Sequence, residues 1–277
     1  MTDKVKLAGV IGQPIAHIRS PQLHGHWLKK YGISGHYIPM DVAQSDLKTV
    51  LETLPKMGFQ GVNVTLPHKE AVLELADSVT DRAALIGAAN TLTFTADGRI
   101  QADNTDGVGF LANIRDYVPE WSAKSGPCVV FGAGGASRAI IAALSQAGAP
   151  VIRVTNRTRA RSDALKDHFG AKIEVIDWVQ AGNVLGDASL LVNTTSLGMQ
   201  GKSALRVPLD GLRPETVVTD IVYTPLETEL LRTAKAIGCR TVDGLGMLLH
   251  QAAPGFERWF GTAPEVDMEL RKAVLAS

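Results

Sequence analysis

The chain has 277 residues, of which 45% are hydrophobic and 20% are charged, a balance typical of globular proteins. Its 28 basic residues equal its 28 acidic residues, so it lacks the basic excess that favours nucleic-acid binding. No apolar run approaches the roughly 20 residues of a membrane span, and the N-terminus shows no apolar leader segment. These features argue against membrane and nucleic-acid partners and favour a cytoplasmic enzyme of about two domains.

The first hundred residues alternate strand and helix signals. Pro21 opens a helix expected to end near Gly32, Ser45 is the expected N-cap of a helix to about residue 54, and Thr80 caps one through residue 86. The expected strands are residues 6–11, 36–40 and 61–66, followed by a hairpin of residues 90–95 and 99–103. This alternation predicts a mainly parallel sheet with the hairpin as an antiparallel edge.

A second series of strands and helices begins near Cys128. The expected strands are residues 128–131, 151–155, 172–175, 190–193, 217–220 and 240–242, with helices at 137–147 and, capped by Thr158, at 158–169. Six strands with helices between them predict a doubly wound dinucleotide-binding (Rossmann) domain. Helical patterns at 247–260 and 266–276 have no strand to follow, so we expect them to pack back on the first domain. The sequence thus predicts a two-domain α/β protein.

A glycine-rich segment lies between the strand at 128–131 and the helix after it. It contains Gly132, Ala133, Gly134, Gly135 and Ala136, with the small Ser137 at the third fingerprint position. Gly132 permits the tight turn, and Gly134 lets a pyrophosphate approach the backbone at the helix N-terminus. A simple tight turn is the alternative, but the flanking strand and helix favour a dinucleotide site.

The end of the next strand indicates which dinucleotide binds. An NAD site usually carries an acidic residue there, whereas this chain has Asn156, Arg157 and Thr158, followed by Arg159 and Arg161. Guanidinium groups match a phosphate with paired hydrogen bonds, so the cluster favours NADP, whose 2′-phosphate would lie here. A solvated basic helix start is the alternative.

Several further motifs appear in one order along almost the whole chain. They are Gly12-Gln13-Pro14-Ile15-Ala16-His17-Ile18-Arg19-Ser20-Pro21, Asn63-Val64-Thr65-Leu66-Pro67-His68-Lys69, Gly87-Ala88-Ala89-Asn90-Thr91, Asp103-Asn104-Thr105-Asp106-Gly107, Asn193-Thr194-Thr195-Ser196-Leu197-Gly198, Asp243-Gly244-Leu245-Gly246-Met247 and Gln251-Ala252-Ala253. Together with Asn156-Arg157-Thr158, these motifs closely resemble the shikimate dehydrogenase family, which includes quinate dehydrogenases.

The resemblance implies an activity and a domain plan. The family reduces 3-dehydroshikimate to shikimate with NADPH, on the route to chorismate and the aromatic amino acids. It implies a substrate-binding catalytic domain of residues 1–105 and 244–277, and a Rossmann domain of residues 106–243. The active site is expected in the cleft between them.

The resemblance also assigns residues to roles. Lys69 is implied as the catalytic acid/base, with Asp106 as its partner. The implied substrate-binding positions are Ile18, Ser20, Thr65, Lys69, Asn90, Asp106, Tyr223 and Gln251. Beyond the glycine loop and the 156–161 segment, the implied NADP contacts are Asp81, Ile221 and Gly244.

The chemistry of Lys69 and Asp106 agrees with these roles. Reduction of a ketone needs an acid to protonate the forming alkoxide, and a lysine ammonium is such an acid. Asp106 opposes loss of that proton, so we take it chiefly as a hydrogen-bond acceptor that orients the reacting hydroxyl. Two solvated loop charges are the alternative.

One position departs from the family pattern. The family usually has two hydroxyl residues, two positions apart, that hold the substrate carboxylate, and this chain has Ile18 and Ser20 there. Loss of one donor to a charged group costs about 1.5–3 kcal/mol. Carboxylate affinity is then reduced, another group compensates, or the substrate differs. A paralogue acting on quinate or a substituted shikimate is therefore the first alternative, and a non-catalytic NADP-binding regulatory protein is the second.

Other polar residues receive plainer interpretations. Cys128 and Cys239 lie in apolar stretches and are expected to be buried thiols of a reduced compartment. His17, His24 and His26 lie close together but lack acidic or thiol partners at metal-ligand spacing, so packing or surface roles are favoured and no metal is expected. The sequence leaves the oligomeric state open, a homodimer included.

Overall fold

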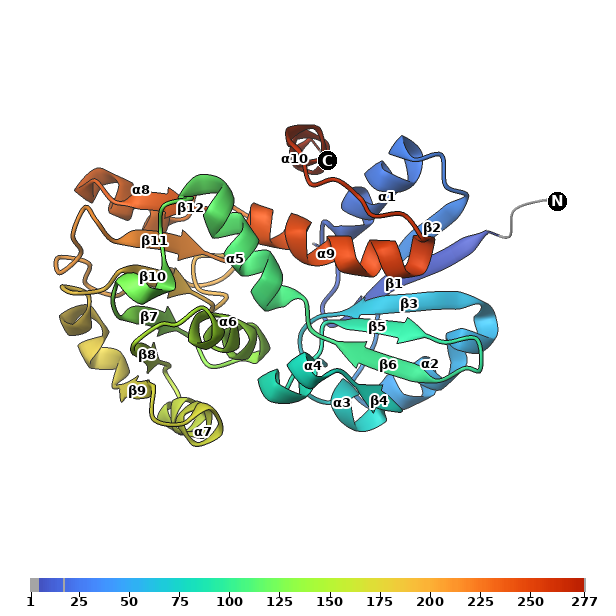
Figure 1. Cartoon of the computed structure of the whole chain (residues 1–277), viewed down its shortest axis with the longest axis horizontal. Helices are drawn as coiled ribbons and strands as arrows, with labels where there is room; N and C mark the ends of the chain where they lie inside the picture. The colour runs from blue at the N-terminus through green and yellow to red at the C-terminus, as the bar shows by residue number, and fades with distance from the viewer. Residues whose placement is uncertain (1–4, 17, 277) are drawn as a thin grey trace. The chain divides into compact units, whose positions relative to one another are not determined.

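The structure, a computed structural model, describes residues 5–16 and 18–276. Its contacts divide the chain into two compact units (Figure 1). The first unit comprises Met1–Gly109 and Leu248–Ser277, and the second comprises Phe110–Met247. Each is an α/β unit, as predicted, and each is built on a six-stranded sheet.

The sheet of the first unit is mixed. Its strands are β1 (Lys6–Gly12), β2 (Gly35–Asp41), β3 (Phe59–Val64), β4 (Ser78–Val79), β5 (Thr91–Phe94) and β6 (Ile100–Asp103), in the order β2-β1-β3-β5-β6-β4. β1 pairs in parallel with both β2 and β3, and the β5–β6 hairpin is antiparallel. The expectation that this hairpin forms an edge is wrong, because the two-residue strand β4 pairs with β6 outside it. So short a strand has no detectable sequence period.

Three of the four helices before residue 100 begin close to the expected residues. The four are α1 (Ser20–Lys30), α2 (Leu47–Thr53), α3 (Val72–Leu75) and α4 (Asp81–Ile86), with a 3₁₀ turn η1 (Pro55–Met57). The short helix α3 was not predicted. Thr80 caps α4 as predicted, because its side chain accepts a hydrogen bond from the N–H of Ala83. The Ser45 cap is wrong: Asp46 is the N-cap residue of α2, and the Ser45 hydroxyl donates to the Asp46 carboxylate at 3.1 Å.

The C-terminal helices pack on the first unit, as the sequence predicts. α9 (Leu245–Phe260) and α10 (Met268–Leu275) follow the last strand, and α10 lies against α1. The indole N–H of Trp259 donates to the carbonyl of Leu92 at 3.1 Å. A Cβ at Gly61 would lie 2.1 Å from Nε1 of Trp259, so glycine is needed where this helix approaches β3.

The second unit is a doubly wound domain with an all-parallel sheet (Figure 1). Its strands are β7 (Cys128–Phe131), β8 (Ile152–Thr155), β9 (Ile173–Ile176), β10 (Leu190–Asn193), β11 (Val217–Asp220) and β12 (Arg240–Val242), in the order β12-β11-β10-β7-β8-β9. Its helices are α5 (Asp106–Tyr117), which begins in the first unit, α6 (Gly135–Gln146), α7 (Arg159–Phe169) and α8 (Glu229–Ile237), with 3₁₀ segments η2 (Ala123–Ser125) and η3 (Trp178–Val184). The strand order reverses between β7 and β10. Doubly wound folds bind their ligands at the carboxyl ends of the strands at such a point, and we call this edge of the sheet the ligand edge.

Two local predictions in the second unit need correction. Thr158 is the N-cap residue of α7, but its side chain makes no capping hydrogen bond. Instead, the side-chain amide of Asn156 donates to the carbonyl of Thr158 at 3.0 Å. No element is predicted for residues 106–117, where α5 buries Phe110 and Ile114 in the core beneath the sheet.

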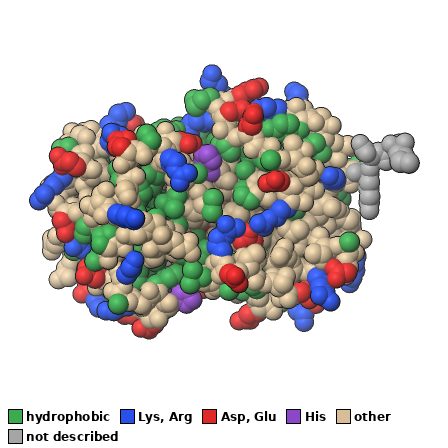
Figure 2. Space-filling view, in the orientation of Figure 1, with side chains coloured by type: hydrophobic (Ala, Val, Ile, Leu, Met, Phe, Trp, Pro, Cys, Tyr) green, Lys and Arg blue, Asp and Glu red, His purple; other side chains and the backbone are tan. Residues whose placement is uncertain are grey.

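Charges of both signs are mixed over the visible surface. Lys and Arg side chains alternate with Asp and Glu side chains on the face seen in Figure 2, in keeping with the equal numbers of each. In the described part of the chain, the longest helix is too short or too polar to cross a membrane.

Candidate active site

Lys69 and Asp106 form a largely buried ion pair in the first unit. Lys69 lies in the segment that follows β3, and Asp106 is the first residue of α5. Nζ of Lys69 lies 2.6 Å from Oδ2 of Asp106, and the two side chains are 13% and 5% exposed. A proton donor and a hydrogen-bond acceptor thus occupy one place, which suits interconversion of an alcohol and a ketone.

The Asn90 side chain joins Asp106 to Gln251. Its Nδ2 atom lies 2.8 Å from Oδ1 of Asp106, 3.0 Å from Oε1 of Gln251 and 2.9 Å from Oγ1 of Thr105. Nε2 of Gln251 donates to the carbonyl of Leu248 at 3.0 Å, and a primary amide has a second N–H. Four residues that the sequence predicts for the site, Lys69, Asn90, Asp106 and Gln251, are therefore joined by direct hydrogen bonds.

Asp103 anchors the segment that presents Asp106. Its carboxylate is 1% exposed and accepts hydrogen bonds from Thr80, Arg82, Arg258 and the N–H of Asn104, at 2.5–3.2 Å. The side chain of Asn104 then accepts from the N–H of Asp106 at 3.0 Å. Burial opposes ionisation of Asp103, but hydrogen bonds from Arg82, Arg258 and Thr80 outweigh it and lower its pKa to about 2.

This lowered pKa of Asp103 predicts a pH-dependent stability. The ordinary pKa of 3.8 applies to the unfolded chain, so the interaction stabilises the fold above about pH 4 and is lost as pH falls towards 2. We expect Asp103→Asn to lower the free energy of unfolding by about 2 kcal/mol at pH 7, with the difference from wild type shrinking below pH 4. Urea unfolding across this pH range measures it, and a difference independent of pH would contradict the assignment.

Ser20 and Tyr37 lie in a buried cluster of the first unit. Ser20 is the first residue of α1, and its side chain hydrogen-bonds the Tyr37 hydroxyl, which donates to Oδ1 of Asn63 at 2.7 Å. The ring of His24 stacks on Tyr37 with a centroid separation of 3.8 Å, and burial lowers the pKa of His24 to about 3, against the effect of Asn63. His24 therefore has the packing role that the sequence favours, whereas His17 lies outside the described residues.

Thr65 and Ile18 are both half-buried. Thr65 directly follows β3, and a Cβ at Gly12 would lie 2.4 Å from its methyl group, so β1 and this segment meet closely. Within residues 5–16 and 18–276, no hydrogen bond links Ile18, Ser20 or Thr65 to the Lys69–Asp106 pair. The substrate-binding roles of Ile18, Ser20 and Thr65 are therefore those that the resemblance implies.

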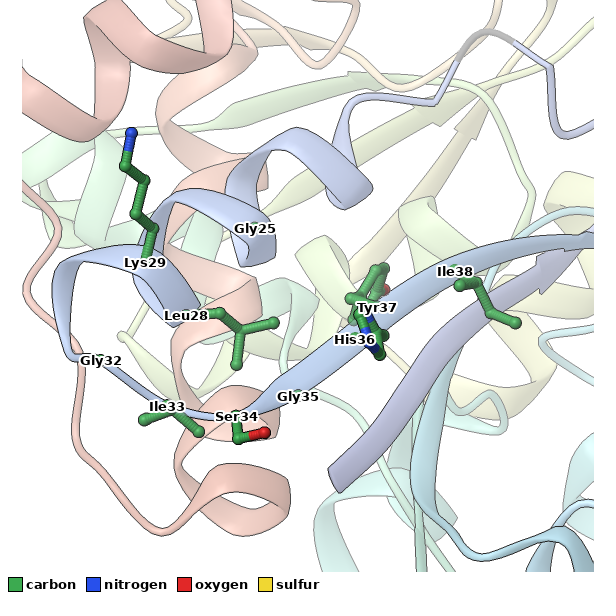
Figure 3. Close-up of a pocket in the computed structure, with 10 residues that line it drawn as sticks. All are labelled: Gly25, Leu28, Lys29, Gly32, Ile33, Ser34, Gly35, His36, Tyr37 and Ile38. Atoms are coloured by element: carbon green, nitrogen blue, oxygen red, sulfur yellow. The ribbon is translucent and has the colours of Figure 1, made fainter. Parts of the chain in front are cut away.

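A surface pocket of about 560 Å³ lies elsewhere on the first unit, between α1 and β2 (Figure 3). It is lined by Gly25, Leu28, Lys29, Gly32, Ile33, Ser34, Gly35, His36, Tyr37 and Ile38. None of these is a residue that the sequence predicts for catalysis or binding. The pocket lining therefore shares no residue with the Lys69–Asp106 network.

In the second unit, the glycine loop has a shape that fits a dinucleotide. Gly132 has φ of +115°, and a Cβ there would lie 2.4 Å from Oγ1 of Thr194. A Cβ at Gly134 would have no neighbour within 4 Å, which leaves room for a phosphate at the start of α6. Ala133 belongs to the same loop, and Gly135 and Ala136 begin α6. Ser137 accepts from the N–H of Gly134 at 3.1 Å and fixes the turn.

The basic segment after β8 is only partly available for a phosphate. Arg159 forms ion pairs with Asp177 and with Asp163, the latter at 3.7 Å, so its charge is already paired at the start of α7. Arg157 and Arg161 are exposed and form no ion pair with any described residue. Two exposed guanidinium groups, Arg157 and Arg161, thus remain in this segment, and a phosphate such as the 2′-phosphate of NADP would fit them.

The remaining predicted positions lie in two further places. Ile221 and Tyr223 follow β11, and a Cβ at Gly244 would lie 2.4 Å from the carbonyl oxygen of Ile221, so glycine is needed after β12. Asp81 is exposed at the start of α4 in the first unit.

Some residues of the site have no role in the sequence analysis. Thr105 donates to the carbonyl of Gln251 at 2.8 Å, and Thr194 donates to the carbonyl of Phe131 at 2.7 Å beside the glycine loop. Both lie in motifs shared with the family, so their polar side chains could have been named as site residues from the sequence. Nothing in the sequence indicates that Arg82 and Arg258 bind Asp103.

Two other sequence expectations bear on the chemistry. Cys128 and Cys239 are free and buried, as predicted. Among the residues that the structure describes, no three His, Cys, Asp or Glu side chains are grouped to hold a metal ion.

Three family models match successive parts of the chain. They describe a shikimate dehydrogenase substrate binding domain (residues 10–92), a shikimate/quinate 5-dehydrogenase (residues 118–200) and a shikimate 5′-dehydrogenase C-terminal domain (residues 244–267). The first and third fall largely in the first unit, and the second falls in the second unit.

Individual proteins match over nearly the full length. A shikimate dehydrogenase (NADP(+)) of Cereibacter sphaeroides is 68% identical over 99% of this chain and 98% of its own. Shikimate 5-dehydrogenase from Thermus thermophilus, solved with NADP(H) and shikimate, is 37% identical with a TM-score of 0.87, covering 99% of both chains. Quinate dehydrogenase from Corynebacterium glutamicum, solved with NAD, is 33% identical with a TM-score of 0.90, also over 99% of both. The chain belongs to the shikimate dehydrogenase family.

Proposed function

We propose that this protein is an NADP-dependent shikimate dehydrogenase, an oxidoreductase that interconverts 3-dehydroshikimate and shikimate on the route to chorismate and aromatic amino acids. The observation that carries the proposal is the largely buried Lys69–Asp106 pair, joined through Asn90 to Gln251. Relatives that match over nearly the full length and are shikimate dehydrogenases (NADP(+)) support it. The first unit is then the substrate-binding catalytic domain, and the second is the dinucleotide-binding domain.

Lys69 has the central role in the proposed reduction. When bound, NADPH would supply the hydride to the carbonyl carbon. As the carbonyl oxygen gains negative charge, the Lys69 ammonium donates a proton to it. Asp106 accepts hydrogen bonds from Lys69 and from Asn90. Asn90 thus holds the Asp106 carboxylate, and the carboxylate orients the Lys69 ammonium. In the oxidative direction the neutral amine of Lys69 takes up the hydroxyl proton and becomes the ammonium again.

Substrate binding is assigned to polar side chains of the first unit and to Tyr223. Asn90 and Gln251 are amides next to Asp106 and suit the ring hydroxyls. Ser20 and Thr65 carry hydroxyl groups at the positions where the family binds the carboxylate and hydroxyls, and Tyr223 completes this set. Asp81, Ile221 and Gly244 are proposed as further cofactor contacts, beside the glycine loop and residues 156–161.

A steady-state assay tests the proposal most directly. Shikimate and quinate are each offered with NADP and with NAD, and nicotinamide absorbance is followed. We expect the highest kcat/KM for shikimate with NADP. Absence of turnover with every pair would remove the dehydrogenase assignment and favour a non-catalytic NADP-binding protein.

A quinate or substituted-shikimate dehydrogenase is the second candidate, because Ile18 stands where the family has a hydroxyl. The similarity of this chain to a quinate dehydrogenase solved with NAD supports this second candidate. The exposed Arg157 and Arg161, and the lack of an acidic residue after β8, favour NADP for this chain. The same assay distinguishes the two candidates.

Restoring a hydroxyl at position 18 tests the cause of this departure. We expect Ile18→Ser to lower KM for shikimate by about tenfold, the effect of one hydrogen bond to a charged group, with a smaller change in kcat. The carboxylate has the same charge in the ground state and the transition state, so its binding affects KM. Both constants are measured for shikimate and quinate, with Ile18→Val as the matched control. An unchanged or higher KM for shikimate would indicate that Ile18 fits a different substrate.

A further inference from the structure

Asp220 is a buried carboxylate that the proposed reaction does not use. It is the last residue of β11, at the ligand edge of the second unit, and is 1% exposed. We propose that ionised Asp220 is a positioning residue that closes the loop of residues 221–227 and thereby holds Ile221 and Tyr223 in their ligand-binding positions. The inference rests on the proposed function, which assigns those two residues to NADP and substrate.

The hydrogen bonds of Asp220 tie both ends of this loop to one carboxylate. Oδ1 accepts from the N–H of Val222 at 3.0 Å, where the loop begins. Oδ2 accepts from the hydroxyl of Thr228 at 2.8 Å, where the loop ends and α8 starts. Oδ1 also accepts from Nδ2 of Asn193, at the end of β10, at 3.0 Å. We call Asp220 with these three donors the Asp220 clasp.

The clasp is continuous with other parts of the ligand edge. Oδ1 of Asn193 accepts from the N–H and the hydroxyl of Thr195, which orders the segment after β10. On the other side, a Cβ at Gly244 would lie 2.7 Å from the carbonyl oxygen of Val222. The start of the loop therefore lies close to the segment after β12. Backbone bonds from the N–H of Ile221 to Asn193 and from the N–H of Gln200 to Thr224 also hold the loop, and Asp220 adds the side-chain bonds that join its two ends.

Among the residues that the structure describes, no cation pairs with Asp220. Its partners are the neutral Asn193 from β10, Thr228 from α8 and the backbone of Val222. The acids beside Thr228, Glu227 and Glu229, are exposed, and Glu227 pairs with Lys235 at 3.7 Å. After β12, Asp243 accepts from the N–H of Leu245. Burial raises the pKa of Asp220 to about 6, against the effect of its three hydrogen bonds.

Because its pKa is raised, Asp220 has opposite effects on the stability of the protein and on the position of the loop of residues 221–227. The folded state favours protonated Asp220, so its contribution to stability is present below about pH 4 and is lost as pH rises through 6. The ionised form nevertheless makes the stronger hydrogen bonds, because bonds to a charged acceptor are about twice as strong as neutral ones. Above pH 6 the carboxylate thus favours a fixed loop at the expense of stability, which is the pattern of a functional residue.

Asp220→Asn tests the proposal, with Asp210→Asn as the matched control because Asp210 is exposed in the same unit. At pH 8 and saturating NADP+, we expect the Asp220 variant to raise KM for shikimate about three- to tenfold. Wild-type kcat/KM should fall below about pH 6, and this acid limb should be absent from the variant. The melting temperature of the variant should be at least that of wild type at pH 8, with its advantage smaller at pH 5.

Thr228 supplies a second, independent variant. Thr228→Val removes one hydrogen bond to the charged form of Asp220, so the acid limb should move to higher pH, whereas Thr228→Ser should retain the wild-type profile. The hydroxyl of Thr228 also accepts from the N–H of Leu231 as the cap of α8. Asp220→Asn leaves that cap intact, which separates loss of the clasp from loss of the cap.

The results that overturn the proposal differ from those that overturn the proposed function. Wild-type KM and an unchanged acid limb in Asp220→Asn would show that the carboxylate does not position the loop. A melting temperature lowered equally at pH 5 and pH 8, with unchanged KM, would assign Asp220 a structural role instead. If wild type does not oxidise shikimate, the proposed function fails. The role of the Asp220 clasp is then tested by NADP+ titration, and equal NADP+ affinity in wild type and Asp220→Asn would overturn it. Titration at pH 8 avoids the cofactor 2′-phosphate, since phosphate monoesters titrate near pH 6.

Discussion

Replacing Lys69 by alanine is expected to lower kcat for shikimate oxidation by about 10²–10⁴-fold, the range typical of a general acid–base group. The ammonium is the proton donor nearest to Asp106 in the network, at 2.6 Å, and alanine has no proton to donate. NADP affinity should stay close to wild type, because Lys69 belongs to the first unit and the glycine loop belongs to the second. Steady-state kinetics and NADP titration measure the two effects separately.

The control for this variant is Lys56→Ala, an exposed lysine of the same unit. It removes the same charge without touching Asp106, so its kcat should equal that of wild type. A Lys69→Ala enzyme with near-wild-type turnover would exclude Lys69 from proton transfer. Equal losses of turnover and NADP affinity would indicate a general structural defect.

Replacing Arg157 by alanine is expected to weaken NADP binding by about ten- to hundredfold while leaving NAD binding nearly unchanged. A charge-assisted hydrogen bond of this type contributes about 1.5–3 kcal/mol, and only NADP carries the 2′-phosphate. The exposed side chain of Arg157 has no ion-pair partner among the described residues, so removing it leaves no buried charge behind. Parallel titrations with the two dinucleotides measure the difference.

Arg159→Ala is the matched control for the Arg157 variant. Arg159 lies two residues away but pairs with Asp163 and Asp177, so its loss should affect α7 more than cofactor choice. If Arg157→Ala weakened NADP and NAD equally, Arg157 would serve the fold or the shared pyrophosphate. The choice of NADP would then lose its main residue-level support.

Many elements could be predicted because their signals are local. The strands β7, β10, β11 and β12 begin and end as predicted. For β7 and β10 the signal is an apolar run bounded by polar residues or glycine, which indicates a buried parallel strand. The glycine loop was recognisable because the tight turn at Gly132, with φ of +115°, requires glycine. Ser45 misled the prediction because α2 begins one residue later than expected, after Asp46, whose side chain makes no capping hydrogen bond.

The sequence by itself determined the α/β class, the Rossmann strand series and, through ordered motifs, the residues proposed for catalysis. Only the tertiary structure decided which of them meet: Asn90 and Gln251 lie 161 residues apart yet hydrogen-bond at 3.0 Å, and Asp103 is held by Arg82 and Arg258 from two different helices. Periodicity and capping act within a few residues and specify which face of an element is buried. Because hydrophobic burial is non-directional, they do not specify what that face packs against, so the contacts of Asp103 and Asp220 arise only when the packed elements bring distant donors together.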